Sequence, residues 1–299
     1  MCQRNWPEIN TRLVQRGSLS FICNSTTIAM IKEARRCPSG QKGGRPPYPT
    51  QLILVLILLK IAYRLSYRGC EGMATSILGG FAIPLPCYTT ICRSMRKLQT
   101  ALPSLSKKRP KVRLIDSSGL KMAGEGEWKR KVHGASYRRR WIKVHLITDP
   151  KSGEIMDILV TLSSCGDIDA GLVLINRMPD YVKRLIGDGA YDGSRLRRMA
   201  YERGLSILAP PPCHAKQRAE FYQRERNEAI QLISALGRDR LARTLWAKIS
   251  GYSQRAGVES TFSRFKRLFG SSLFSRRHEA IAVEAHMKAL LSNLWLQSN

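Results

Sequence analysis

Acidic residues are scarce in this sequence, and the few that it has are unevenly placed. Of 299 residues, 22 are Asp or Glu and 50 are Lys or Arg, which gives a formal net charge of +28. The first 115 residues contain only Glu8, Glu33 and Glu71 and no aspartate, so they carry about half of the net positive charge. Such a charge keeps a protein in solution and attracts polyanions. Nucleic acid is therefore the favoured partner, although ribosomal, RNA-binding and membrane-surface proteins share this composition.

Paired cysteines and histidine-rich stretches are also absent. The sequence has 8 Cys and 5 His, contains no Cys-x-x-Cys pair, and offers no closely spaced partner for Cys213–His214. A structural zinc site needs four ligands in closely spaced pairs, so this pattern argues against a zinc ribbon. Unpaired cysteines in a chain of this length favour a reducing cytosol over a disulfide-stabilised fold.

No apolar run is long enough to cross a membrane. The longest, residues 52–59, is followed by Lys60 and Arg64, whereas a spanning helix needs about 20 apolar residues. This run predicts a buried helix. The N-terminus shows no secretory signal pattern, so no membrane partner is expected.

The basic N-terminal part, residues 1–105, is predicted to be a helical DNA-binding region. Gly and Pro in residues 38–49 indicate an arm or linker, and residues 50–100 have the pattern of a helix-turn-helix. The three expected helices start near their capping residues, which are Thr50, Ser66 and either Thr89 or Thr90. The third carries the basic residues Arg93, Arg96 and Lys97. This helix fits either a major-groove recognition helix or part of a supporting bundle, and the sequence does not separate the two.

From residue 106 to 299 the pattern changes to strands followed by helices. The expected strands are 112–116, 143–148, 154–162, 182–186 and 205–208, with a hairpin turn at 149–153. The expected helices are 173–178, 194–203 and most of the chain after residue 215, closing with 279–297. This order predicts the α/β class, with a mixed sheet flanked by helices.

Two aspartates, Asp116 and Asp188, directly follow apolar strand runs. Carboxylates at the ends of adjacent strands can bind Mg²⁺, which takes oxygen ligands and keeps several waters. An aspartate after a strand is also a common turn residue or helix cap. Asp192 is a second-ranked candidate ligand, because its Tyr-Asp-Gly setting suits a turn. Asp167 and Asp169 are interpreted as caps of the helix that follows them.

A third carboxylate, Glu259, belongs to a polar pattern late in the chain. Tyr252, Arg255, Glu259 and Lys266 would lie within a stripe about 60° wide if all four were helical, at 100° per residue. Gly257 could instead delay the helix start and leave Tyr252 outside it. The apolar residues Val258, Phe262, Phe265 and Phe269 fall on an adjoining sector that can pack against a sheet. An ordinary surface helix with an Arg–Glu pair is the alternative interpretation.

A basic cluster lies between the first two expected strands. It comprises Lys129, Arg130, Lys131, His133, Arg138, Arg139 and Arg140. We interpret it as a loop that follows DNA phosphates, with Trp128, Tyr137 and Trp141 available to stack on an unpaired base. The alternative is a solvated hairpin whose aromatic side chains pack inward.

With these residues in view, the chain resembles bacterial insertion-sequence transposases of the DDE type that carry a Y-R-E-K signature. The matching segments are Leu114–Lys121, Gly124–Lys129, His133–Gly134, Arg138–Trp141, Gly187–Asp192 and Gly257–Lys266. The similarity extends over essentially the whole chain. The intervals between Asp116, Asp188 and Glu259 leave room only for a short insertion at about residues 205–250.

The resemblance implies an RNase H-like catalytic domain and a DNA transposase that cleaves at terminal inverted repeats and transfers the 3′ ends to target DNA. It assigns Asp116, Asp188 and Glu259 as catalytic metal ligands for Mg²⁺, which Mn²⁺ is expected to replace. Tyr252, Arg255 and Lys266 would contact DNA near the scissile phosphate. Without metal the three carboxylates repel one another, so a poorly assembled site is expected until metal and DNA bind.

The resemblance also implies double-stranded DNA as partner, a homo-oligomer on DNA, and a bacterial cytoplasmic location at the nucleoid. Two alternatives stay open: an inactive, repressor-like DNA-binding relative, and a nuclease of the same fold that cuts but does not join strands. The intact set of three carboxylates argues against the first alternative.

Overall fold

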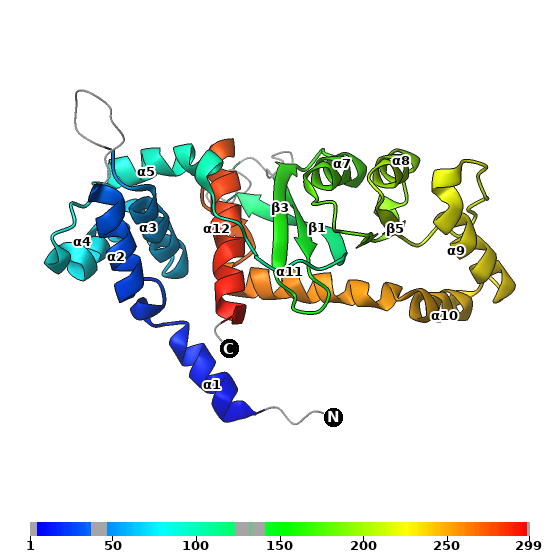
Figure 1. The fold of residues 1–299 in the computed structure, drawn as a ribbon, viewed down its shortest axis with the longest axis horizontal. Coiled ribbons are helices and arrows are strands. Elements are labelled where there is room, and N and C mark those ends of the chain that lie inside the picture. The colour runs from blue at the N-terminus through cyan, green and yellow to red at the C-terminus, as the bar shows by residue number, and fades with distance from the viewer. Residues whose placement is uncertain (1–4, 37–46, 123–131, 133–140, 298–299) are drawn as a thin grey trace. The chain divides into compact units, whose positions relative to one another are not determined.

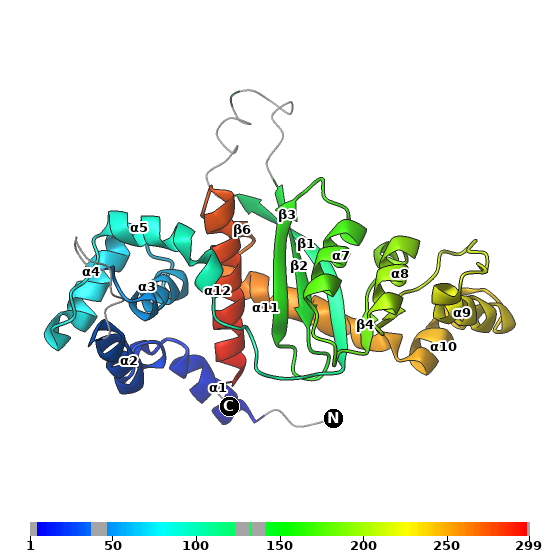
Figure 2. The same ribbon diagram turned by 45° about the horizontal axis from the view of Figure 1, so that its top comes forward.

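The computed structural model describes residues 5–36, 47–122, 132 and 141–297. They form two compact units (Figures 1 and 2): residues 1–104 with 275–299, and residues 105–274. The sequence-based division after residue 105 placed 275–299 in the C-terminal domain, whereas the structure groups this segment with the N-terminal helices. The reason is that the last helix buries its apolar residues against those helices.

The first unit is helical. Its α-helices are α1 (Trp6–Gln15), α2 (Ser25–Arg36), α3 (Thr50–Ala62), α4 (Tyr67–Leu78), α5 (Tyr88–Lys97) and α12 (His278–Gln297). Short 3-10 turns occur at η1 (Leu19–Phe21), η2 (Gly79–Phe81) and η3 (Leu98–Ala101).

Helix α3 is the predicted buried helix. It is apolar on all sides, and α2, α4, α5 and α12 pack around it. Among the described residues, no single helix has both the length and the apolar character to span a membrane. Only the bent pair Thr50–Ala62 and Tyr67–Phe81 passes that test, with 114° between its members.

The helix starts in this unit were only partly predicted. Ser66 caps α4 as expected, because its Oγ accepts the Gly69 N–H at 3.0 Å. Thr50 is instead the first residue of α3, and the start of α5 lies at Cys87 rather than at Thr89 or Thr90. At α5 a carboxylate from the neighbouring helix performs the capping role: Glu71 Oε2 accepts the Tyr88 N–H at 2.8 Å.

The second unit contains a mixed sheet with strand order β3-β2-β1-β4-β5. The strands are β1 (Val112–Met122), β2 (Trp141–Thr148), β3 (Ile155–Leu162), β4 (Arg184–Ile186) and β5 (Ser206–Leu208). β1, β2 and β3 are antiparallel, whereas β4 and β5 run parallel to β1. A two-residue strand, β6 (Ser272–Leu273), also pairs with β1. The predicted α/β class is confirmed.

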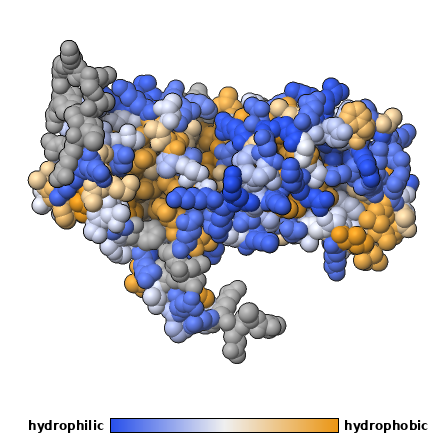
Figure 3. All heavy atoms as spheres, in the orientation of Figure 1, coloured by the Kyte–Doolittle hydropathy of each residue, from blue (hydrophilic) through white to orange (hydrophobic). Residues whose placement is uncertain are grey.

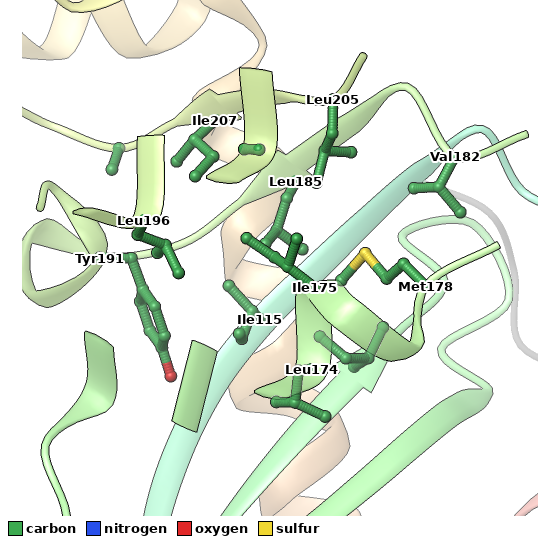
Figure 4. Close-up of a cluster of buried hydrophobic side chains, with 13 residues drawn as sticks. Ile115, Leu174, Ile175, Met178, Val182, Leu185, Tyr191, Leu196, Leu205 and Ile207 are labelled. Atoms are coloured by element: carbon green, nitrogen blue, oxygen red, sulfur yellow. The ribbon is translucent and has the colours of Figure 1, made fainter. Parts of the chain in front are cut away.

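Helices cover both faces of this sheet. α7 (Asp167–Arg177) and α8 (Ser194–Glu202) lie on one face, and α11 (Ala256–Phe269) runs along the other (Figures 1 and 2). The core under α7 and α8 joins β1, β4 and β5 through buried side chains that include Ile115, Leu174, Leu185 and Leu196 (Figure 4). Burial of this apolar surface is the main force that fixes the sheet.

The predicted insertion is a helical hairpin of α9 (Arg224–Ala235) and α10 (Arg240–Ser250), preceded by η6 (Phe221–Gln223). Ile233 and Trp246 form its small core, onto which Leu208 of β5 packs. Figure 3 shows an apolar patch over α10, where Leu241, Leu245 and Ile249 are exposed.

Candidate active site

Strand β1 continues past the end of its neighbour β4, and this opens a gap in the sheet. The parallel register pairs Leu114 with Ile186 at the last position before β4 ends. β6 joins β1 only at Lys121 and Met122. Between these pairs, one edge of β1 has no strand beside it among the described residues. An open position at a strand end is where α/β sheets form their ligand sites.

Asp116 and Asp188 lie at this gap and at the same level of the register. Each comes two residues after the last pair, Leu114 and Ile186. Asp116 is therefore inside the eleven-residue strand β1 and not at its end as the sequence indicated. The end that matters belongs to β4, and neighbouring strands are separated by about 4.8 Å. Asp116 thus lies on β1, and Asp188 follows the end of the neighbouring strand β4.

Strand alternation decides which way Asp116 points. Ile115 is part of the core under α7 and α8, so Leu114 and Asp116 project to the opposite face, where α11 lies. Gly257 of α11 approaches this face closely: a Cβ built on it would lie 3.2 Å from Leu114 Cδ1. The helix that carries Glu259 therefore packs directly on the strand that carries Asp116.

Arg255 joins two of the three predicted carboxylates. Its Nη2 lies 3.2 Å from Asp116 Oδ2, and its Nη1 lies 2.7 Å from Glu259 Oε1. The other oxygen of Asp116, Oδ1, accepts the Ser117 N–H at 2.8 Å. Asp116 is nearly buried, with 12% of its side chain exposed, whereas the Glu259 side chain is 59% exposed.

Asp188 begins the 3-10 turn η5 (Gly189–Tyr191), and its Oδ1 accepts the Ala190 N–H at 3.0 Å. The segment η7 (Tyr252–Arg255) lies against β1, which carries Asp116, and against β4, which precedes Asp188. This placement brings Arg255 into the electrostatic field of all three carboxylates.

The electrostatics agree with this convergence. Burial raises the pKa of Asp116, and the charges of Asp188 and Glu259 raise it further, against the lowering effects of Ser117 and Arg255. Burial also raises the pKa of Tyr252, and the charges of the same three carboxylates raise it further. Burial lowers the pKa of the Arg255 guanidinium, but the negative charges of Asp116 and its neighbours outweigh this effect and raise the pKa overall. The arginine is therefore held in its charged form.

The predicted polar stripe is not one continuous helix face. Tyr252 and Arg255 belong to η7, and only Glu259 and Lys266 lie on α11. The helix starts at Ala256, so Gly257 lies within it and Tyr252 falls outside it, an outcome that the sequence left open. Tyr252 packs on Trp246 of α10, with ring centroids 5.2 Å apart. The apolar sector behaves as predicted, since Val258, Phe262, Phe265 and Phe269 are buried.

Lys266 also faces the gap. Its Nζ donates to Ser118 Oγ at 2.6 Å. Ser118 lies two residues after Asp116, so both side chains occupy the same face of β1. The sequence identified Lys266, but the serine that holds it was missed, because a serine within a strand carries no distinctive pattern.

The three carboxylates suit a magnesium ion by chemistry but do not yet enclose one. They supply only oxygen donors, which Mg²⁺ prefers. Within the described part of the chain, no group of three or more His, Cys, Asp or Glu side chains is arranged to hold an ion. The Arg255 guanidinium lies where two of the carboxylates would have to share a cation. The donors therefore fit Mg²⁺ by their chemistry, and Arg255 would have to move before Asp116 and Glu259 could share an ion.

Asp192, the second-ranked candidate ligand, belongs to a buried network of ion pairs. Its side chain is 2% exposed and lies between two buried arginines, Arg197 at 2.7 Å and Arg226 at 2.9 Å. Arg197 also donates to the Ile207 carbonyl, and Arg226 donates to the Lys216 carbonyl. Asp192 therefore ties η5 and α8 to β5 and to the helical hairpin, and its oxygens are fully used.

Asp167 and Asp169 do not cap α7 with their side chains, because the cap position is Gly166. Asp167 pairs with Lys143 at 2.7 Å, and Asp169 pairs with Arg195 at 3.3 Å. Burial opposes ionisation of Asp167, but the hydrogen bonds from Lys143 and Ser117 lower its pKa overall. Both residues lie on the face of the sheet opposite Arg255.

The remaining predicted DNA contacts lie elsewhere. Arg93, Arg96 and Lys97 are on α5 in the first unit, and Arg93 and Lys97 are exposed. The loop residues Lys129, Lys131, His133, Arg138, Arg139 and Arg140 lie outside the described residues. A cavity of about 670 Å³ in the second unit is lined by Lys183, Tyr201 and Phe221, at the opposite end of β4 from Asp188. It does not belong to this site.

Comparison with known families identifies the chain. A model described as a transposase DDE domain matches residues 107–294, and another with the same description matches residues 14–125. The first match covers more than half of the chain. The chain belongs to the DDE transposase family. Its mixed sheet, covered by helices on both faces, agrees with the predicted α/β class.

One solved structure similar to this transposase is a piggyBac transposase synaptic complex with hairpin DNA, determined by cryo-EM. The TM-score is 0.39 and the sequence identity is 9%, over 95% of this chain and 74% of that chain.

Proposed function

We propose that this chain is a Mg²⁺-dependent DNA transposase that cleaves the ends of its element and joins the 3′ ends to target DNA. Asp116, Asp188 and Glu259 are the proposed metal ligands. The observation that carries the proposal is the contact of Arg255 with Asp116 on β1 and with Glu259 on α11, beside the gap in the sheet. The charge of Asp188, which follows β4, acts on the pKa of both Asp116 and Arg255.

Bound metal would make the attacking water or 3′-hydroxyl a stronger nucleophile and would stabilise the leaving oxygen. The chain's own residues orient the DNA. Arg255 and Lys266 provide positive charge beside the carboxylates for a scissile phosphate, and Tyr252 borders the same position. Ser117 and Ser118 hold the functional groups in place from the backbone and side chain of β1.

DNA is the proposed partner of both units. The net charge of +28 supports phosphate contacts over a wide surface, and α5 presents Arg93 and Lys97 outward as a candidate recognition helix. Because two element ends must be held together, we propose a homo-oligomer on DNA, in a bacterial cytoplasm at the nucleoid.

The decisive experiment uses the DNA that flanks the coding region as substrate. A duplex with the terminal inverted repeat should be cut at its 3′ end in Mg²⁺ or Mn²⁺ and not in EDTA. Cut ends should then appear joined to a supercoiled plasmid. Binding without cutting would favour a repressor-like protein, and cutting without joining would favour a nuclease of the same fold.

A further inference from the structure

Arg255 occupies the place between two carboxylates that a divalent cation would share. One guanidinium nitrogen contacts Asp116 from β1 and another contacts Glu259 from α11. A guanidinium is a planar fork that stays protonated at all physiological pH values. The fork therefore offsets part of the negative charge of both carboxylates and links the strand to the helix.

These contacts compete with metal binding at the same oxygens. Asp116 Oδ1 is already used by the Ser117 N–H, and Arg255 takes Oδ2. A cation bound to Asp116 and Glu259 would lie within a few ångströms of a positive guanidinium, which is unfavourable in a partly buried site. The arginine and the metal therefore compete for these carboxylates through the repulsion of their charges.

Arg255 is able to leave. Its side chain is 22% exposed, and its Nε is buried without a hydrogen-bond partner in the described part of the chain. The side chain is therefore held only through its two terminal nitrogens. Once released, the same fork can bind the oxygens of a DNA phosphate, for which its geometry is well suited.

We propose that Arg255 is the internal counter-ion of the metal site: it holds Asp116 and Glu259 together in the free protein and yields them when metal binds. The inference rests on the proposed function. It has a consequence for binding, because linkage between two ligands is reciprocal. A DNA phosphate that draws Arg255 away strengthens metal binding, and metal that displaces Arg255 strengthens DNA binding.

The test measures Mn²⁺ binding to the DNA-free, full-length protein by electron paramagnetic resonance. Arg255→Gln removes the fork, and Arg267→Gln removes the same charge from an exposed position on α11, the helix that follows Arg255. Arg255→Gln should bind Mn²⁺ at least about five-fold more tightly than both the wild type and Arg267→Gln, the lower range of a typical coupling between sites. Arg255→Lys retains the charge without the fork, so its affinity for Mn²⁺ should lie between those of the wild type and Arg255→Gln.

The second arm adds a short duplex. Wild type and Arg267→Gln should then bind Mn²⁺ more tightly, whereas Arg255→Gln should gain less, because its competitor is already absent. Equal or weaker Mn²⁺ affinity in both Arg255 variants, relative to Arg267→Gln, overturns the counter-ion role and leaves the transposase proposal intact. Failure of every protein to bind Mn²⁺, even with DNA, overturns the metal site itself.

Discussion

At the scale of single residues, Asp116 combines two opposing demands. Its carboxylate is nearly buried, and burial together with the charges of Asp188 and Glu259 raises its pKa. Metal binding requires the ionised form. The folded protein therefore carries an unfavourable charge at this position, which Arg255 and the Ser117 N–H only partly relieve and which the proposed metal would offset.

This predicts that Asp116→Asn stabilises the metal-free protein at neutral pH. A carboxyl whose pKa is raised by folding contributes stability below its unfolded pKa, near 3.8, and loses that contribution as the pH rises through the folded value. The asparagine amide does not ionise, so Asp116→Asn avoids this loss of stability. We expect a gain of about 1 kcal/mol at pH 7, a usual size for a stabilising substitution. Urea denaturation in EDTA at pH 7 and at pH 4 measures it.

The gain should shrink at pH 4, because protonation of the wild-type carboxyl lowers the cost of burying its charge. Asp169→Asn is the control, because that carboxylate is exposed on the other face of the sheet. A loss of stability in Asp116→Asn at pH 7 would mean that the ion pair with Arg255 outweighs the cost of burial.

Alanine at Asp116, Asp188 or Glu259 should abolish cleavage while DNA-end binding remains. Each substitution removes an oxygen donor from the proposed metal site, so the rate should fall at least about 10³-fold, equivalent to several kcal/mol of lost stabilisation. Single-turnover cleavage and a gel-shift assay on the same end duplex measure the two properties. Any one of the three variants that still cuts at the wild-type rate loses its assignment.

At the scale of elements, the turn that carries Asp188 is fixed from behind. Asp192 follows η5 by one residue and lies buried between Arg197 of α8 and Arg226 of α9. Loss of one member of a buried ion network leaves the others as uncompensated charges, which is far more costly than loss of an exposed pair. The network thus links the position of Asp188 to the helical hairpin.

Asp192→Ala should therefore lower the free energy of unfolding by about 3–5 kcal/mol, and cleavage should fall with it. The matched control is Glu228→Ala, which breaks the exposed Arg224–Glu228 pair on α9 and should cost less than about 0.5 kcal/mol. Urea denaturation compares the two variants. Similar midpoints for both would show that the network contributes little.

Elements also separate what the sequence predicts from what it cannot. The apolar runs of β1 to β5 and the buried sector of α11 were predictable, because apolar residues recur at the spacing typical of a strand or of a helix. The position of Asp116 inside a long strand was not, since it depends on where the neighbouring strand β4 ends. The role of Asp192 was equally hidden, because Arg197 and Arg226 reach it only through tertiary packing.

At the scale of the whole molecule, charge is the dominant property. A net charge of +28 is spread over both units, and α5 presents Arg93 and Lys97 one turn apart on its exposed side. Each phosphate contact releases condensed counter-ions, so affinity for DNA should fall steeply as salt rises.

Arg93→Ala and Lys97→Ala should each weaken DNA binding and reduce the slope of log affinity against log salt by about 0.9 if one phosphate contact is lost. Arg177→Ala on α7 is the control, because it removes an exposed arginine from the sheet face opposite Asp116. Binding titrations over a range of salt concentrations measure the slopes. Slopes identical to the wild type in both α5 variants would exclude phosphate contact by that helix.

The gap beside β1 has a consequence for biosynthesis. Arg255 and Asp116 are 139 residues apart in sequence, and Lys266 and Ser118 are 148 apart. A ribosome therefore makes β1 to β5 before it makes Arg255, Glu259 and Lys266, which lie on η7 and α11. A polypeptide that ends before η7 would lack these side chains, and it would also lack α12, which packs on α3 and α5 of the first unit. Such truncated copies should therefore lose the helical core of the first unit together with the proposed metal site.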